Sequence, residues 1–512
     1  MRKSTFFQVW NWWYCILTSS FLDDISLLQY FEKSAWPTPE VVAEECGGDE
    51  LFLALYKELT LRHLQSIARP SPKDRVDGWN VYCSLFDLII NHMDEATKSD
   101  DAFFLLPEWV FDIFHEFVYQ FQGFCQFRTT TFANAAKYGP NGTNEGKAPP
   151  NHITDSIEVL SNNRDAWAIQ NVLTYLHKFA NNTMNAPAFR YLALFASVTQ
   201  SRLECLLGDY NASLNVLSNV NSKTLIDPPR ADEDGKPSTG MEIVDSVFAA
   251  KLSMAYHQGV CYLMLRRYKD ASKVLGGICS VMLRGFRVGE FKNMPGSDQF
   301  IKLYDRMIAL LAILTHVCPD NGMVDDSVSK VIRDRHGKQL SKIEAGEEGY
   351  EDLFIFACPK FVTPSVPRYE LALTDGPSAG PHGQDAYKLQ VKHFMNEMAN
   401  QQTMRKLRSY MKLYTSIGVE KLGRLVMEED FVPLLIAYKR KMRQIENKVS
   451  DDPAEINSET VGTVMDIHYF ITDDMIHVDE AERLHRFENY FMKQISQSNN
   501  IIGRLDSISL NI

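Results

Sequence analysis

Three short segments contain residue types that do chemistry in enzymes, at spacings close to known motifs. Gly376, Ser378 and Gly380 have the spacing of a nucleophile elbow, and His382 follows closely. An elbow needs an apolar strand before the serine and a histidine from far along the chain, and this segment has neither. The spacing therefore predicts a flexible loop, with a hydrolase built on Ser378 as the weaker alternative.

The other two segments approximate a phosphate-binding loop and a zinc-binding helix. The loop 142–147 is one residue short between its glycines and is followed by Ala148 where a metal-binding hydroxyl is needed. His115 and Glu116 begin a zinc-protease pattern, but Tyr119 stands where the second histidine ligand belongs. We therefore predict a chain that is not an enzyme and has no catalytic residues, metal or cofactor.

Basic residues cluster twice in the C-terminal third. The first cluster contains Arg405, Lys406, Arg408 and Lys412, and the second contains Lys439, Arg440, Lys441 and Arg443. Solvated helix faces are the ordinary interpretation of both. The second cluster lies on and after the third helix of a predicted winged helix, which reads nucleic acid in that fold. It is our candidate for RNA contact, with an acidic protein surface as the alternative.

Composition limits the class of protein. The 512 residues are 45% hydrophobic and 23% charged, which is ordinary globular usage, and their number predicts about three domains or one extended repeat array. A net charge of −12 argues against a nonspecific nucleic-acid clamp. The nine cysteines are scattered and include no Cys-x-x-Cys pair, which is typical of a reducing compartment. We therefore expect a cytoplasmic protein.

The first residues have roughly the layout of a secretory signal. Arg2 and Lys3 precede an aromatic, apolar stretch that ends near Leu17. Gln8 and Asn11 interrupt this stretch, which is too short to span the roughly 30 Å of a bilayer core. We expect a buried aromatic helix or a misplaced start site here, and no membrane segment.

Apolar residues recur at helical spacing over most of the chain. Leu51, Leu55 and Leu59 form one stripe, and an aromatic stripe of about four turns runs from Trp109 to Phe124. Both stripes predict helices packed in a core. Stretches rich in turn-forming residues interrupt the pattern and predict exposed loops at 137–152, 226–241 and 372–386.

Two turns between helices resemble each other and the turn of tetratricopeptide repeats. Tyr210 precedes Ser213 by three residues in the first turn, and Tyr268 precedes Ala271 in the second. The tyrosine would fill the wedge between two antiparallel helices, and the small residue would let their backbones approach closely. The two copies predict a right-handed stack of helix pairs.

The C-terminal third changes to the element order of a winged helix. Three helical patterns, at 387–414, 418–427 and 431–438, precede two short strands at 464–471 and 475–478. A long helix from 480 to 497 follows. It places four apolar residues on one face, namely Leu484, Phe487, Phe491 and Ile495. Such a face packs either on its own domain or on another subunit.

A series of short sequence motifs resembles those of one protein family. The motifs, in chain order, are Trp36-Pro37, Leu55-Tyr56-Lys57-Glu58-Leu59 with Arg62-His63, Asp112-Ile113, Glu116-Phe117, Tyr119-Gln120-Phe121-Gln122 with Phe124 and Arg128, Leu206-Leu207-Gly208-Asp209-Tyr210, Leu263-Met264 with Arg266-Arg267-Tyr268, Cys358-Pro359-Lys360-Phe361 with Val366-Pro367 and Tyr369, Lys412-Leu413-Tyr414-Thr415, and Asp474-Met475-Ile476-His477. Over residues 30–498 the chain resembles the subunit L family of eukaryotic translation initiation factor 3, which are PCI-domain proteins. Residues 1–24 depart from the acidic, tyrosine-rich start usual in that family.

The resemblance implies a mostly α fold in which a right-handed, tetratricopeptide-like array precedes a PCI module. The expected parts are an atypical segment at 1–24, a helical-repeat region at 25–300, a PCI domain at 301–478 with its winged helix at about 403–478, and a C-terminal helix and tail at 479–512. It also implies a non-catalytic scaffold subunit that supports assembly of the factor, its binding to the small ribosomal subunit and mRNA recruitment, next to subunits E and K.

The residues expected to meet those partners lie at the end of the chain. They are Ile471, Met475, Ile476 and Val478 in the wing, and Leu484, Phe487, Phe491 and Ile495 in a shared helical bundle. A hairpin offers an edge strand for sheet extension, and the terminal helix offers an apolar stripe. Two alternatives stay open. One is a PCI subunit of another assembly, the proteasome lid or the COP9 signalosome, and the other is an RNA-binding winged-helix module.

Overall fold

A computed structural model gives the fold, and its description covers most of the chain. The described residues are 37–46, 49–67, 70–96, 107–181, 187–220, 247–289, 291, 297–318, 324–344, 349–376, 385–426, 431–441, 443–447, 459–463, 467–480 and the isolated positions 491, 494, 495, 498 and 502. The predicted segment at 1–24, the loop at 226–241, Ser378, Leu484 and Phe487 lie outside them.

The chain is mostly α-helical, as predicted, and divides into two compact units. Unit 1 contains Met1–His257, Met282–Tyr304 and Pro359–Gln390, and unit 2 contains Gln258–Val281, Asp305–Cys358 and Val391–Ile512. Each unit therefore combines segments that are far apart in the sequence. The domain boundaries drawn from the sequence at residues 24, 300 and 478 stay predictions.

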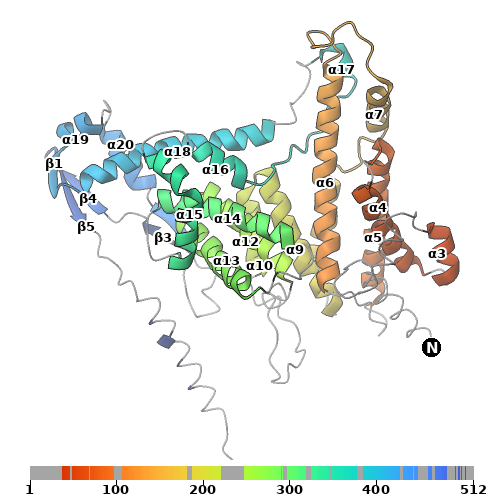
Figure 1. Cartoon of the computed structure of the whole chain (residues 1–512), viewed down its shortest axis with the longest axis horizontal. Helices are drawn as coiled ribbons and strands as arrows, with labels where there is room; N and C mark the ends of the chain where they lie inside the picture. The colour runs from red at the N-terminus through yellow and green to blue at the C-terminus, as the bar shows by residue number, and fades with distance from the viewer. Residues whose placement is uncertain are drawn as a thin grey trace, which may run out of the picture. The chain divides into compact units, whose positions relative to one another are not determined.

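Unit 1 is helical from its first described residues onward (Figure 1). They are α3 Pro39–Cys46, α4 Glu50–Ile67, α5 Pro72–Ala96, α6 Pro107–Ala136, α7 Asn151–Asn162, α8 Ile169–Ala180, α9 Pro187–Leu207, α10 Tyr210–Val220 and the short α17 Leu371–Thr374. The predicted loop at 137–152 is a series of turns up to residue 150. The loop predicted at 372–386 begins instead inside α17.

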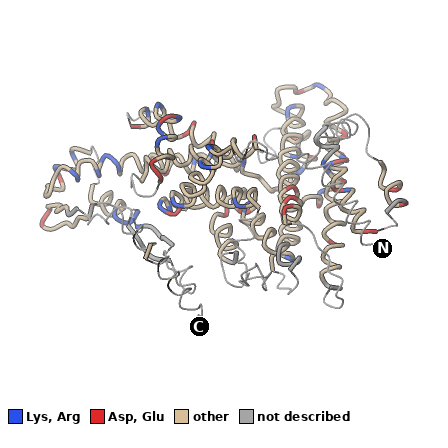
Figure 2. Tube along the Cα trace, turned by 60° about the horizontal axis from the view of Figure 1, so that its bottom comes forward, with Lys and Arg blue, Asp and Glu red and all other residues tan. Residues whose placement is uncertain are grey.

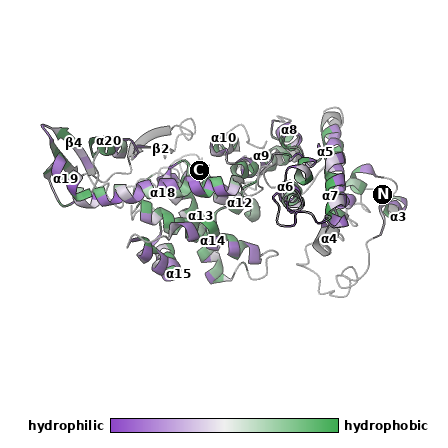
Figure 3. Ribbon diagram, turned by 90° about the horizontal axis from the view of Figure 1, so that it is seen from above, coloured by the Kyte–Doolittle hydropathy of each residue, from purple (hydrophilic) through white to green (hydrophobic). Residues whose placement is uncertain are grey.

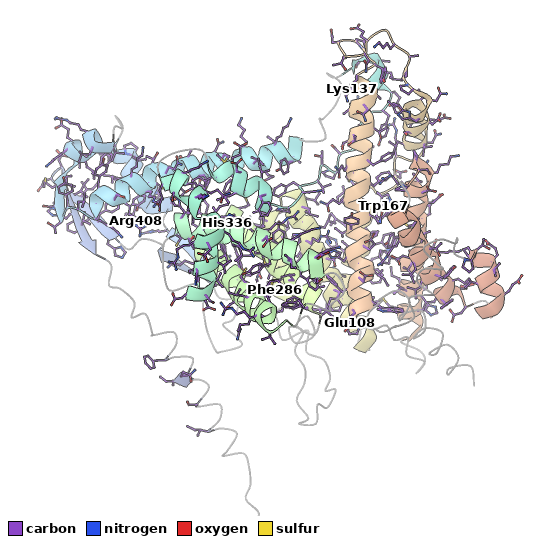
Figure 4. All side chains as sticks on the ribbon, viewed as in Figure 1. Glu108, Lys137, Trp167, Phe286, His336 and Arg408 are labelled. Atoms are coloured by element: carbon purple, nitrogen blue, oxygen red, sulfur yellow. The ribbon has the colours of Figure 1, made fainter. Side chains whose placement is uncertain are left out.

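The aromatic stripe of α6 forms the centre of the unit 1 core, as its spacing predicted. Phe117 and Phe121 are fully buried and Phe124 is nearly so. The Phe117 ring centroid lies 4.8 Å from that of Phe86 on α5 and 5.3 Å from that of Trp167, and Figure 4 shows Trp167 beside α6. The helix has 30 residues, about twice the predicted length, because buried residues continue beyond the aromatic stripe.

Small and aromatic residues hold the two helix-pair turns as predicted. Tyr210 and Tyr268 are buried at the starts of their helices. Ser213 on α10 is fully buried, with its hydroxyl 2.9 Å from that of Ser201 on α9. Ala271, at the matching position of the second turn, is fully buried as well. Each pair therefore packs backbone close to backbone, which is the geometry of a helical-repeat array.

Each turn contains one residue in the left-handed region. Gly208 has a φ of 88° and Arg266 a φ of 64°. In both turns the next backbone N–H donates to a carbonyl five residues earlier, at 3.0 and 2.8 Å. This is the hydrogen bond of a Schellman cap, which ends one helix and lets the next begin.

Substituting Gly208 by alanine should therefore destabilise unit 1 by about 1–2 kcal/mol. A Cβ there would lie 2.7 Å from the Gln390 side chain and in a backbone region that alanine disfavours. Gly123, in the middle of α6 with open space around it, is the matched control, and Gly123→Ala should stabilise by about 0.5–1 kcal/mol. All seven tryptophans lie before residue 168, so urea unfolding followed by tryptophan fluorescence reports on unit 1. Equal effects of the two substitutions would contradict the role of the turn.

The remaining helices belong wholly or partly to unit 2. They are α12 Phe248–Met264, α13 Tyr268–Val288, α14 Ser297–Val317, α15 Asp326–Glu344, α16 Tyr350–Ala357, α18 Asp385–Met411, α19 Val419–Val426 and α20 Phe431–Lys441. A Cβ added at Gly259 of α12 would lie 2.5 Å from the Leu275 side chain of α13, so these two helices also pack closely. Figure 3 shows hydrophobic and hydrophilic residues alternating along α18.

The end of unit 2 has the helix–strand–helix–helix–strand–strand order of a winged helix. Helix α18 leads into β1 Ser416–Gly418, helices α19 and α20 follow, and β4 Ile467–Thr472 and β5 Met475–Glu480 form the final hairpin. The antiparallel sheet has the order β1-β5-β4, with Ile417 opposite Ile476 and Ile476 opposite Ile471.

Two features of this region were absent from the prediction. Strand β1 has three residues, too few to show a period in the sequence. A second hairpin, β2 Arg443–Asn447 with β3 Glu459–Thr463, lies between the third predicted helix and the first predicted strand. Strand β4 begins at Ile467, three residues after the predicted start.

Candidate functional site

The winged-helix core fixes how α20 and the hairpin are presented. Leu435 and Ile476 are fully buried, and Tyr469 and Tyr438 nearly so. The Tyr469 hydroxyl donates to the Leu435 carbonyl at 2.5 Å, which ties β4 to α20. Burial raises the pKa of the Tyr469 phenol, so this donor stays protonated at neutral pH. The hairpin and α20 therefore form one rigid element.

The four wing residues proposed from the sequence divide between surface and core. Ile471 is 41% exposed and Met475 is 38% exposed. Ile476 is fully buried, and Val478 packs against the same core. We therefore correct the prediction that Ile476 contacts a partner. Its side chain packs in the core, because it points to the sheet face that α20 covers. Since β5 pairs with both β1 and β4, the sheet has an edge at each of these two strands. Strand β4, with six residues against three in β1, offers the longer edge.

The outer face of the hairpin carries an aromatic residue that the sequence analysis missed. Phe470 on β4 is 51% exposed and stacks on His477 of β5, with ring centroids 5.1 Å apart and planes 23° apart. The strand alternates at this point, since Tyr469 points into the core and Phe470 points out. That alternation was the available signal for an exposed aromatic residue.

The four basic residues at the end of α20 have different surroundings. Lys439 donates to the Tyr469 carbonyl at 3.1 Å and lies over the Tyr469 ring. Lys441 pairs with Glu397 of α18 at 3.3 Å. Arg440 and Arg443 are exposed. Lys439 is exposed as well but is tied to Tyr469, so Arg440 and Arg443 are the two exposed cations of this cluster for which the described residues show no such contact.

The terminal apolar face is described at two of its four proposed positions. Phe491 is 60% exposed and Ile495 is 54% exposed. Leu484 and Phe487 lie outside the described residues. Whether the four meet on one helix face stays a prediction.

Basic and acidic residues mix along the described helices, as Figure 2 shows. The first basic cluster is partly neutralised within unit 2, since Arg405 on α18 pairs with Glu344 on α15 at 3.6 Å. Contact of the second cluster with RNA or with an acidic protein surface stays a prediction.

The catalytic near-misses have structural roles where they are described. His115 on α6 is contacted by Nη1 of Arg202 on α9 at 2.9 Å. Burial, followed by the Arg202 charge, holds the pKa of His115 well below its usual value. Tyr119 is 58% exposed on the same helix. In the described part of the chain, no His, Cys, Asp or Glu cluster could hold a metal ion, and no helix is long and apolar enough to span a bilayer.

Glu58, Arg62 and Asp112, which belong to the family-like sequence motifs, meet in a partly buried polar network between α4, α5 and α6 that also includes Tyr82. Glu58 is 1% exposed, pairs with Arg62 one turn later, and accepts a 2.7 Å hydrogen bond from the Tyr82 hydroxyl. Arg62 also pairs with Asp112 of α6. Burial raises the pKa of the Glu58 carboxyl, and the Arg62 guanidinium opposes this shift. The network fixes how α4 and α5 pack on α6.

A second meeting point joins α6 to residues more than 200 positions later. The segment 359–370 runs along unit 1, and we call it the strap. The Gln122 side chain donates to the Lys360 carbonyl at 2.8 Å, and the fully buried Arg128 donates to the Pro364 carbonyl. The Val362 N–H donates to the carbonyl of Leu206, which lies in the last turn of α9, at 2.9 Å. Sequence motifs around residues 122–128, 206 and 360–364 are thus neighbours in unit 1, although they are far apart in the sequence.

The fold and these contacts define the class as a helical-repeat protein that ends in a winged-helix module. A family model described as RNA polymerase I-associated factor PAF67 matches residues 74–498, and the chain belongs to that family. Relatives named eukaryotic translation initiation factor 3 subunit L are 29% identical over 505 residues in Nematostella vectensis, 28% over 513 in Danio rerio and 28% over 497 in Mus musculus. These alignments cover 94%, 94% and 91% of this chain and 86%, 80% and 78% of the relatives. The resemblance stated from the sequence motifs is confirmed.

Proposed function

We propose that this chain is a non-catalytic subunit of eukaryotic translation initiation factor 3. The single observation that carries the proposal is the similarity to relatives of that name along 94% of the chain. In this role it acts in the cytoplasm as a scaffold that supports assembly of the factor, binding to the small ribosomal subunit and mRNA recruitment. Subunits E and K are its proposed neighbours.

The winged helix supplies the surface for this role. The free edge of β4 can extend the sheet by pairing with a strand of another subunit, while Ile471 on β4 and Met475 on β5 offer exposed apolar contacts. Phe491 and Ile495 add exposed apolar area further along the chain. We propose that the hairpin and the terminal segment bind different neighbours.

Affinity purification of the tagged chain from its own cytoplasm, read by mass spectrometry, tests the proposal. The wild type should recover the subunits of initiation factor 3, including E and K, and the small ribosomal subunit. Ile471→Asp with Met475→Asp, and separately Leu484→Asp with Phe491→Asp, should each reduce recovery at least fivefold. Leu413→Asp, at a residue 73% exposed in the same unit, is the matched control and should change nothing.

The other outcomes identify the alternatives. Recovery of proteasome-lid or COP9 signalosome subunits would assign the chain to a different PCI assembly. A chain recovered alone would contradict the scaffold role and would favour an RNA-binding module.

A further inference from the structure

The outward side of α20 is an apolar face with cations at one end. Val432 is 43% exposed and Ile436 is 50% exposed, and Arg440 continues the same four-residue spacing. The buried residues Leu435 and Tyr438 point to the opposite side of the helix, onto the sheet. The exposed face therefore takes no part in the winged-helix core.

The charged side chains of α20 itself have one sign, and they lie at its C-terminal end. Helix α20 contains no acidic residue and has Lys439, Arg440 and Lys441 in its last turn. Lys439 and Lys441 are held by Tyr469 and Glu397, which leaves Arg440 and the exposed Arg443 facing solvent. Basic residues at a helix C-terminus complement the helix dipole, but an exposed pair of arginines also attracts anionic groups.

We propose that this face, made of Val432, Ile436 and Arg440, together with the exposed Arg443 at the start of β2, is the docking surface for an amphipathic acidic segment of a partner protein. Two large apolar side chains of that segment would cover Val432 and Ile436, and carboxylates beyond them would pair with Arg440 and Arg443. The inference does not depend on membership of a particular complex.

The same face is poorly suited to RNA. In nucleic-acid-binding winged helices, the third helix offers polar side chains to bases and phosphates. Here the middle of the helix offers two branched aliphatic side chains that cannot form hydrogen bonds. Exposed apolar groups flanked by arginine are instead the usual composition of protein interfaces.

Photocrosslinking of the full chain in cells tests the proposal. A benzoylphenylalanine at position 436 should form an adduct whose partner peptide, sequenced by mass spectrometry, contains at least two large apolar residues and two or more carboxylates. The same probe at position 413, 73% exposed on the same unit, should not form that adduct.

Charge reversal separates recognition from simple proximity. Arg440→Glu with Arg443→Glu should reduce the adduct at least fivefold, and raising salt from about 0.1 M to about 0.5 M should weaken it as well. Lys406→Glu, at an exposed lysine of α18, is the matched control and should have no effect. Both positions are exposed, so the variants should retain the circular dichroism and melting temperature of the wild type.

Four outcomes would overturn the inference. They are an adduct with RNA, an adduct with a segment lacking carboxylates, an adduct that survives charge reversal, and no adduct above that at position 413. Because the variants leave β4 and the terminal segment unchanged, recovery of the complex subunits would still be expected, so failure here is distinguishable from failure of the proposed function.

Discussion

Glu58→Ala should lower the free energy of unfolding of unit 1 by about 3 kcal/mol. The substitution leaves the Arg62 guanidinium, whose side chain is only 19% exposed, without its buried partner, and it removes the acceptor of the Tyr82 hydroxyl. The loss should fall at the low end for a buried ion pair because Arg62 keeps Asp112. Urea unfolding followed by tryptophan fluorescence measures it.

A double substitution checks the cause. Glu58→Leu with Arg62→Met replaces both charges by apolar side chains of similar size, and it should recover the part of the loss that comes from the unpaired Arg62 charge. The Tyr82 hydroxyl still lacks its acceptor, so the recovery should be partial. The exposed pair Arg164–Glu370 of unit 1, with side chains 45% and 60% exposed, is the comparison, and Glu370→Ala should leave the unfolding free energy nearly unchanged. A double variant as unstable as the single one would show that packing, not charge, governs this position.

Phe117→Ala should have a larger effect, a loss of about 4 kcal/mol. The Phe117 ring is fully buried among Trp79, Tyr82, Phe86 and Trp167, so its removal leaves a cavity between rings that are fixed by their own neighbours. The neighbouring rings also lose Phe117 as a stacking partner, which adds to the free-energy cost of the cavity.

Tyr119→Ala is the matched control for this prediction. Tyr119 lies two residues later on the same helix and is 58% exposed. Its substitution should change the unfolding free energy by less than about 0.5 kcal/mol. Alanine raises helix propensity at both positions, so similar losses in the two variants would contradict the central place of Phe117 in the aromatic core.

Periodicity predicted the long helices because a buried face imposes its spacing on the sequence. The stripe through Phe117 and Phe121 and the turn residues Tyr210 and Ser213 behave as their spacing indicated. Strand β1 was missed because three residues show no alternation, and Ile476 was misplaced because alternation alone does not say which sheet face α20 covers.

The contacts between distant segments could not be predicted in this way. Gln122 and Arg128 donate to backbone carbonyls of the strap, and every residue has a carbonyl, so the sequence carries no mark of the acceptor. The pair Glu58 and Arg62 has the spacing of helix neighbours, but its link to Asp112 depends on how α4 and α6 pack. The exposure of Val432 and Ile436 likewise depends on which side of α20 the sheet covers.

The strap has a consequence for how the protein is made. Arg128 and Pro364 are 236 residues apart, so the ribosome must add that many residues after Arg128 before their hydrogen bond can form. At roughly 5–20 residues per second, synthesis of this stretch takes about 12–50 s. During that interval α6 has been synthesised, but the Pro364 carbonyl that accepts the hydrogen bond from Arg128 does not yet exist. The nascent unit 1 therefore presents an unfinished surface to chaperones for most of its synthesis.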